Sequence, residues 1–300
     1  MSAGCAPVTR SGIVALCGRP NVGKSTLVNA IVGAKVAIVS DRPQTTRRSI
    51  RGVMTTPDWQ LVLVDLPGLQ RPRDALTQRM ARQVQRTLTD AEASLLLLNG
   101  EQGVGPGDRY LTGLLVAAAA PVIVGVNKVD RLDRARTAAV LQAAAELGVG
   151  EEVFPISART GEGLDGLVAA LAQRLPEGPF LFDAAEHSDQ SVEVELAELI
   201  REPILHRTRH EVPHAVEVEL AEVQRPRPGV AVIRALVWVE TESQKGILIG
   251  AHGQMIKAIG SSARRQIERR LGERVHLDLS VRVRRHWRSD EALLDRLGIE

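Results

Sequence analysis

Short apolar runs alternate with amphipathic helical stretches along residues 1–175. The alternation predicts an α/β domain with a mostly parallel sheet, because parallel strands need helical crossovers, which then cover both faces of the sheet. The expected strands are Ile13–Cys17, Ser49–Met54, Gln60–Asp65, Ala93–Asn99, Val122–Val126 and Glu152–Ile156. The expected helices are Lys24–Ile31, Asp74–Leu88, Gly107–Ala118, Arg134–Leu147 and Leu164–Arg174.

Beyond residue 175 the pattern changes to that of a linker and a second, smaller domain. Residues 176–190 contain two prolines and a glycine that end the preceding helix, so we expect them to form the linker. Residues 191–285 predict an α+β domain, and residues 286–300 a C-terminal tail. The elements expected there are the helix Ser191–Arg209, the strands Ala215–Gln224 and Val230–Glu240, the helices Gln244–Gly250 and Gly253–Leu271, and the strand Val275–Val283.

The sequence GRPNVGKST, residues 18–26, stands between the first expected strand and the first expected helix. A glycine-rich turn at this place lets successive backbone N–H groups wrap a pyrophosphate, and the positive end of the helix dipole faces the same anion. Lys24 can reach the outer phosphates, and the Ser25 hydroxyl can ligate Mg²⁺. The alternative is an ordinary glycine turn before a helix. The residues expected to contact the nucleotide here are Asn21, Val22, Gly23, Lys24, Ser25 and Thr26.

Two further short motifs follow expected strands. Asp65 ends the third strand, where its carboxylate is placed to hold the Mg²⁺ shell, and the N–H of Gly68 can meet a terminal phosphate. The sequence Asn-Lys-Val-Asp, residues 127–130, follows the fifth strand. The Asp130 carboxylate can accept the two N–H groups of a guanine edge, which adenine does not offer. Each motif alone is also compatible with a polar surface loop.

The order of the motifs is more informative than any one of them. We expect Asn127 to tie its loop to the phosphate loop and the Lys128 stem to cover the base. After the sixth strand, Ser157, Ala158 and Arg159 are expected to offer backbone N–H groups to the guanine oxygen. Motifs at the ends of strands one, three, five and six resemble those of the translation-factor-like GTPases of the P-loop class, which have a Ras-like fold. The resemblance implies GTP and GDP as nucleotides, with Mg²⁺.

The same resemblance gives residues 41–48 a role. In these GTPases a threonine here completes Mg²⁺ coordination only when the γ-phosphate is present, and Thr46 is the first candidate, with Thr45 second. Leu69 stands where Ras-like enzymes have a glutamine that orients water. Leucine cannot position water by hydrogen bonding, so slow intrinsic hydrolysis is expected. The expected catalytic residues are Lys24, Thr46, Asp65 and Gly68, and the expected metal ligands are Ser25, Thr46 and Asp65.

In the second domain, Gly250 and Gly253 lie within the pattern IGxxGxxIKxIG. Such a turn joins two helices tightly enough for a nucleic-acid backbone to approach the main chain, as in the GxxG loop of a KH domain, which clamps about four single-stranded nucleotides. The order of the expected elements resembles the type II KH arrangement. Residues 250–288 carry ten basic and three acidic side chains, although an exposed basic helix face would look the same. The expected RNA contacts are Lys245, Gly250, Ala251, His252, Gly253, Lys257, Arg264 and Arg265.

A P-loop GTPase domain followed by a KH domain resembles the Era family of bacterial ribosome-assembly GTPases over nearly the whole chain. The shared motifs include GRPNVGKST, Gln-Thr-Thr-Arg at 44–47, NKVD, Arg-Glu-Pro-Ile-Leu at 201–205 and Glu-Val-Pro-His at 211–214. The resemblance implies a protein, expected to be monomeric, that binds the 3′ end of 16S ribosomal RNA and acts in assembly of the small (30S) ribosomal subunit. GTP would favour the RNA-binding form and hydrolysis would permit release. Peripheral association with the cytoplasmic membrane is a further expectation.

Two other functions stay open at this point. One is a constitutive RNA-binding protein whose GTPase domain is mainly structural, although intact Lys24, Ser25, Asp65 and Asp130 argue against it. The other is a GTPase that acts on another RNA or on a membrane partner, although such relatives lack the KH core.

Composition narrows the class of protein further. The 300 residues are 44% hydrophobic and 25% charged with a net charge of +2, as in globular domains. No apolar run approaches the ~20 residues of a membrane-spanning helix, which favours the cytoplasm. The two cysteines, Cys5 and Cys17, make no disulfide framework, and Cys17 is expected to be a buried thiol. His206, His210 and His214 are expected to be surface or packing residues and not metal ligands.

Overall fold

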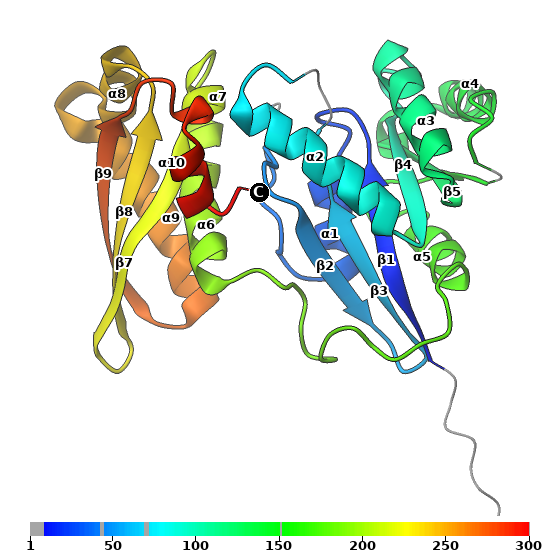
Figure 1. The fold of residues 1–300 in the computed structure, drawn as a ribbon, viewed down its shortest axis with the longest axis horizontal. Coiled ribbons are helices and arrows are strands. Elements are labelled where there is room, and N and C mark those ends of the chain that lie inside the picture. Colours follow the sequence, from blue (N-terminus) through cyan, green and yellow to red (C-terminus); the bar gives the residue numbers. More distant parts are fainter. Residues whose placement is uncertain (1–8, 43–44, 69–71, 151, 300) are drawn as a thin grey trace, which may run out of the picture. The chain divides into compact units, whose positions relative to one another are not determined.

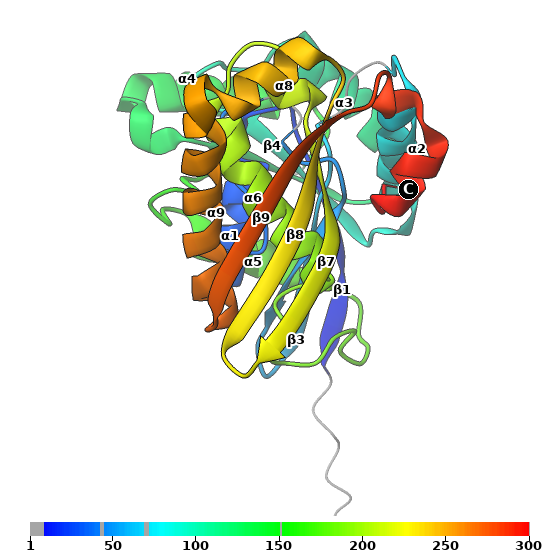
Figure 2. The same ribbon diagram turned by 90° about the vertical axis from the view of Figure 1, so that its left-hand side faces the viewer.

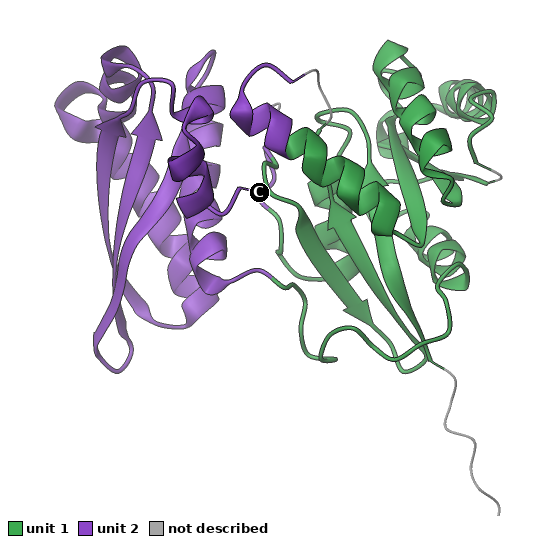
Figure 3. Cartoon of the chain, in the orientation of Figure 1, with its two compact units in different colours: residues 1–37, 46–71, 80–189 green, residues 38–45, 72–79, 190–300 purple. Residues whose placement is uncertain are grey.

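The structure, a computed structural model, describes residues 9–42, 45–68, 72–150 and 152–299. The chain forms two compact units (Figure 3). Unit 1 consists of Met1–Ala37, Thr46–Arg71 and Met80–Asp189, and unit 2 of Ile38–Thr45, Pro72–Arg79 and Gln190–Glu300. Two short segments that lie early in the sequence are therefore part of the C-terminal unit.

Unit 1 is built on a six-stranded sheet with the order β2-β3-β1-β4-β5-β6 (Figure 1). All neighbouring strands are parallel except β2 and β3, which are antiparallel. The strands are β1 (Arg10–Cys17), β2 (Ile50–Thr55), β3 (Trp59–Asp65), β4 (Ala93–Asn99), β5 (Val122–Asn127) and β6 (Val153–Pro155). The helices are α1 (Lys24–Val32), α2 (Ala75–Asp90, with its first turn in unit 2), α3 (Pro106–Ala118), the 3₁₀ turn η1 (Val129–Arg131), α4 (Arg134–Ala145) and α5 (Leu164–Gln173).

Alternating side chains of the central strands enter two separate cores, one on each face of the sheet. From β1, Val14 and Leu16 pack with α1 and α5, whereas Ala15 and Cys17 pack with α2, α3 and α4. Successive strand residues point to opposite faces, so a strand covered on both faces must be apolar throughout. The predicted mostly parallel sheet with helices on both faces is confirmed.

Unit 2 contains a three-stranded sheet of order β7-β8-β9, in which β7 pairs antiparallel and β9 parallel with β8 (Figure 2). The helices α6, α8 and α9 cover one face and enclose an apolar core with it. Ile38, from the early segment 38–45, is also a member of this core and is 4% exposed. The elements are α6 (Val192–Arg207), α7 (Val212–Ala215), β7 (Glu217–Arg227), β8 (Val230–Val239), α8 (Glu242–Ile249), the 3₁₀ turn η2 (Ala251–Gly253), α9 (Gln254–Leu271), β9 (Arg274–Val283), the 3₁₀ turn η3 (Trp287–Ser289) and α10 (Glu291–Arg296).

Residues 286–299, most of the predicted C-terminal tail, are folded. Trp287 is fully buried and its indole N–H donates to the carbonyl of Ala215 at 2.8 Å. Asp290 caps α10 by accepting from the N–H of Leu293 at 3.0 Å. The helix holds the first turn of α2, because Arg79 donates to Asp295 at 2.7 Å and also pairs with Glu291. Sequence periodicity misses α10 because six residues span fewer than two helical turns.

The segment that follows α5 lies along unit 1 as a strap. Gln60, fully buried on β3, accepts from the N–H groups of Leu181 and Phe182 at 2.7 and 2.9 Å and donates to the Phe182 carbonyl at 2.8 Å. Farther along, the N–H of Val53 donates to the carbonyl of His187 at 2.9 Å. One buried amide side chain therefore satisfies backbone groups of a segment more than 120 residues away in sequence.

Replacing Gln60 with leucine should destabilise unit 1 by about 2 kcal/mol, because backbone groups of the strap lose their partners while the core volume is nearly kept. We also expect faster amide hydrogen exchange at Leu181 and Phe182. Urea unfolding and hydrogen exchange measure the two effects. Gln85→Leu, on the exposed face of α2, is the matched control and should change neither quantity. Unchanged exchange in the strap would show that Gln60 does not hold it.

Candidate functional site

The loop between β1 and α1 is shaped by glycine. Gly23 has φ 102°, in the left-handed region, and a Cβ there would lie 2.3 Å from Nδ2 of Asn127. Any larger residue would therefore push the two loops apart. Lys24, 7% exposed, donates from Nζ to the carbonyls of Gly18 and Arg19 at 3.0 and 3.3 Å. Its ammonium group lies against the loop that sequence analysis assigns to phosphates.

The end of β5, the loop after it and helix α3 hold this loop in place. The amide of Asn127 donates to the Val22 carbonyl at 2.8 Å, as the sequence predicts, and Lys128 donates to the Asn21 carbonyl at 3.0 Å. A third anchor was not predicted: Arg19 donates to Oδ1 of the fully buried Asp108, on α3, at 2.9 Å. No sequence pattern signals the Arg19 pair, because its partners are 89 residues apart.

Ser25, Thr46 and Asp65, the three predicted metal ligands, converge in unit 1. The Ser25 hydroxyl donates to Oδ2 of Asp65 at 2.6 Å, and the Thr46 hydroxyl lies 3.2 Å from both of these oxygens. The other carboxylate oxygen of Asp65 is buried and has no hydrogen-bond partner among the described residues. A buried carboxylate with two hydroxyls is a donor set that Mg²⁺ prefers, so these residues fit the ion.

The structure also separates the two candidate threonines. The hydroxyl of Thr45 donates to the Arg42 carbonyl at 2.6 Å, whereas that of Thr46 faces Asp65. Gly68, the other expected phosphate contact, is buried, and a Cβ there would lie 3.0 Å from Cγ of Pro20 in the phosphate loop. Leu69, on which the expectation of slow hydrolysis rests, lies outside the described residues.

Burial shifts the protonation equilibria of the site. It raises the pKa of Asp65 above its ordinary value, although the charge of Lys24 opposes the shift, and it lowers the pKa of Lys24. Burial also raises the pKa of Cys17 to about 12, so this thiol stays protonated, as expected of a packing residue.

The loop that carries Asp130 is internally hydrogen-bonded. The Asp130 carboxylate accepts from the Ser157 hydroxyl at 2.7 Å and from Arg159 at 2.5 Å, and these contacts hold its pKa below the ordinary value. The N–H of Ser157 donates to the Glu162 carbonyl and that of Ala158 to Oδ1 of Asn127, both at 2.9 Å. Two of the three backbone donors expected for guanine are thus engaged within the protein.

In unit 2, the glycine pair makes the expected tight turn between α8 and α9. Gly250 and Gly253 have φ of 71° and 74°, and His252 between them has φ 51°. A Cβ on Gly250 would lie 2.7 Å from Cβ of Met255, so the first glycine is required for close approach. The two loop-centre residues, Ala251 and His252, are exposed. The start of α9 is therefore accessible to an anion.

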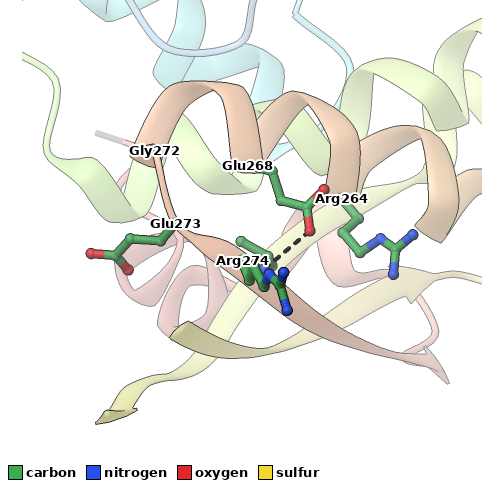
Figure 4. A pocket seen from close by; sticks show the side chains of 6 residues that line it. Arg264, Glu268, Gly272, Glu273 and Arg274 are labelled. Carbon is green, nitrogen blue, oxygen red and sulfur yellow. Dashed lines mark hydrogen bonds between the residues drawn. The ribbon is translucent and has the colours of Figure 1, made fainter. Parts of the chain in front are cut away.

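The basic side chains expected to contact RNA are mostly on the surface of α9. Lys257, Arg264 and Arg265 are exposed, and the first two lie seven residues apart on nearly the same side of the helix. Lys245, on α8, is half-buried and lies 3.7 Å from Glu242. Arg264 also borders a surface hollow at the end of α9, where Glu268 accepts from the N–H of Val275 at 3.2 Å (Figure 4). The other residues lining this hollow are Gly272, Glu273, Arg274 and Val275.

The described part of the chain contains neither a histidine, cysteine and carboxylate cluster for a metal nor a helix that could cross a membrane. No group of three or more histidine, cysteine and acidic residues there could hold a metal ion, so His206, His210 and His214 form no such cluster. No helix of this part is both long and apolar enough to cross a membrane.

Comparison with known proteins identifies both units. Residues 13–128 match the family described as 50S ribosome-binding GTPase, and residues 211–288 match the KH domain family. The GTPase Era of Mycobacterium sp. (strain KMS) is 45% identical over 294 residues, which cover 96% of this chain and 98% of that protein. The chain belongs to the Era family of GTPases. The GTPase Era of Mycobacterium bovis BCG is 44% identical over the same share of each chain.

Two solved Era structures match the fold of nearly the whole chain. Era in complex with MgGDPNP and nucleotides 1506–1542 of 16S ribosomal RNA has a TM-score of 0.93 and 33% identity, and covers 97% of this chain and 99% of that one. A variant of Aquifex aeolicus Era bound to GDP·AlF₄⁻ has a TM-score of 0.92, 34% identity and the same coverage. As a member of the Era family, the chain is a GTPase, and the predicted P-loop GTPase and KH folds are confirmed.

Proposed function

We propose that this Era-family protein is a GTP-dependent switch that binds the 3′ end of 16S ribosomal RNA during assembly of the small ribosomal subunit. In unit 1, the phosphate loop from Asn21 to Thr26 would bind the phosphates, with Lys24 on the outer ones and Gly68 near the last. Mg²⁺ would be held by Ser25, Thr46 and Asp65, and would neutralise charge on the phosphate oxygens. This role is supported by the convergence of these three side chains and by the Asp65 oxygen that has no partner among the described residues.

Guanine selectivity would come from the loop of Asp130. Its carboxylate has a lowered pKa and is ionised, and each of its oxygens would accept one N–H group of guanine beside the bond it already accepts within the protein. Asn127 and Lys128 tie this loop to the phosphate loop, so base and phosphates would be read by one connected structure. Because Ser157 and Ala158 donate inside the protein, Arg159 is the remaining candidate backbone donor for the guanine oxygen.

The RNA part of the proposal is supported by one observation above others. The chain shares 33% identity over 97% of its length with an Era protein whose structure contains nucleotides 1506–1542 of 16S RNA. The loop Ala251–Gly253 and the basic side of α9 would hold the RNA backbone, with Gly250, Lys257, Arg264 and Arg265 around it. A 16S RNA contact favours the small subunit, although the matching GTPase family is described as binding the 50S subunit.

Linkage between nucleotide and RNA provides the test. We expect a 16S 3′-end oligonucleotide to bind more tightly with GDPNP than with GDP, and the RNA to raise GDPNP affinity by the same factor. Fluorescence anisotropy measures both affinities, with a scrambled oligonucleotide as control. Equal GDPNP affinity with and without RNA would favour the constitutive RNA-binding protein.

The double variant Ala251→Asp, His252→Asp should lose about thirtyfold or more in RNA affinity, because two carboxylates would face phosphates. It should keep nucleotide binding.

Location and assembly state complete the proposal. We infer a cytoplasmic monomer that associates peripherally with the membrane, for which the basic side chains of α9 would supply the attraction to anionic lipid. A GTPase acting on a different RNA is the competing function, and the scrambled oligonucleotide binding as tightly as the 16S sequence would support it.

A further inference from the structure

The segment Ile38–Thr45 belongs to unit 2, although it lies in sequence between α1 and β2 of unit 1 (Figure 3). Side chains of helix α6 bind two of its described residues, Val39 and Thr45. The N–H of Val39 donates to Glu202 at 3.1 Å, and its carbonyl lies 2.9 Å from Nε2 of His206. With Ile38 in the apolar core, the segment is a structural element of the KH unit.

Arg201 makes the contact closest to the end of this segment. Its guanidinium is 1% exposed and donates both to the carboxylate of Glu198, at 2.6 and 3.0 Å, and to the backbone carbonyl of Thr45. The fully buried Glu217 lies 3.9 Å away. The two carboxylates offset the cost of burying the charge. The nitrogen Nη2 donates both to Glu198 and to the carbonyl of Thr45, so the same guanidinium joins α6 to the end of the segment.

The next residue in the chain is Thr46, which belongs to unit 1 and faces Ser25 and Asp65. The carbonyl of Thr45 and the N–H and Cα of Thr46 lie in one rigid peptide plane. A donor that fixes the Thr45 oxygen therefore restricts the orientation of that plane. It thereby restricts the directions in which the Thr46 side chain can leave the backbone.

We propose that Arg201 is a positioning residue for GTP hydrolysis, which acts through the Thr45–Thr46 peptide group to keep the Thr46 hydroxyl among the Mg²⁺ ligands. The inference rests on the proposed role of Thr46 as a ligand that is used only when the γ-phosphate is present. Arg201 should therefore affect the GTP-bound state and not the GDP-bound state. Arg201 is the first residue of the motif Arg-Glu-Pro-Ile-Leu at 201–205, so the proposal gives this motif a role.

The test compares two variants of the full chain with a matched control. Arg201→Met removes all donors, and Arg201→Lys keeps the charge near Glu198 but loses the planar fork. Arg207→Met removes an exposed charge from the same helix and should behave as the unmodified protein. Affinities for GDPNP and GDP are measured over a range of Mg²⁺ concentrations, together with kcat and KM for GTP.

We expect Arg201→Met to lose about tenfold in GDPNP affinity and in kcat, the effect of one charge-assisted hydrogen bond, with GDP affinity unchanged. Raised Mg²⁺ should recover part of the GDPNP affinity, and Arg201→Lys should show a smaller loss. A purely structural role would lower thermal stability and affect both nucleotides equally, which would overturn the inference. If Arg201→Met does not fold, the ratio of GDPNP to GDP affinity in Arg201→Lys distinguishes the positioning role from the structural one. Failure of the unmodified protein to bind GDPNP would instead reject the proposed function.

Discussion

Replacing Asp65 with asparagine will lower the rate of GTP hydrolysis by about a hundredfold or more and will raise the Mg²⁺ concentration needed for half-maximal activity. Asparagine is nearly the same size and can still accept hydrogen bonds from Ser25 and Thr46, so the fold is kept. It lacks the negative charge, and one of its two oxygens becomes an amide nitrogen that cannot ligate a metal. Single-turnover hydrolysis across a Mg²⁺ titration measures both effects.

The control for this variant is Asp58→Asn, in the exposed turn between β2 and β3. It removes the same charge from the same unit and should leave the Mg²⁺ dependence unchanged. The proposed metal site would be refuted by an Asp65→Asn protein that hydrolyses GTP at the unmodified rate and Mg²⁺ requirement.

Replacing Asp130 with asparagine will reduce GTP affinity by about a hundredfold or more and will reverse the preference between guanine and xanthine nucleotides. The carboxylate offers two acceptors to the two N–H groups of guanine, whereas an amide offers one acceptor and one donor. Xanthine carries a carbonyl where guanine has its amino group, so it matches the amide. Competition between GTP and xanthosine triphosphate gives the ratio of affinities directly.

Asp133→Asn is the matched control for the base loop. Asp133 caps α4 by accepting from the N–H of Arg136 at 2.8 Å, and asparagine caps helices equally well. This variant should change neither stability nor base preference. An unchanged ratio of GTP to xanthosine triphosphate affinity in the Asp130 variant would mean that another group selects the base.

Much of unit 1 could be predicted because its signals are local. Fully apolar strands, each followed by glycine or a polar residue, predict the parallel sheet. They also predict Asp65 and Asn127 at strand ends and Lys24 at the start of the helix after the first strand. The carboxyl ends of neighbouring parallel strands share one edge of a sheet, so chain order alone brings these residues together. The tie from Asn127 to Val22 was predictable for the same reason.

The remaining features depend on partners that are distant in sequence. The strap bound by Gln60, the Arg19–Asp108 pair and the Arg201–Thr45 contact join residues 89 to 156 positions apart, and neither member of a pair shows its partner in any local pattern. The sequence also does not predict the contacts of Arg79 with α10, because an arginine on an amphipathic helix normally faces water. Buried polar residues of this kind become recognisable only when the tertiary structure places their partners beside them.

The membership of Ile38–Thr45 in the KH unit has a consequence for the order of synthesis. About 160 further residues must be made after these before all of α6 exists, a delay of roughly ten seconds at ordinary rates of translation. During that time the chain before Thr46 lacks the contacts that Arg201 and Glu202 provide in the finished protein. The nascent GTPase unit therefore emerges without these contacts, and the proposed coupling of nucleotide to RNA would arise only after α6 has been made.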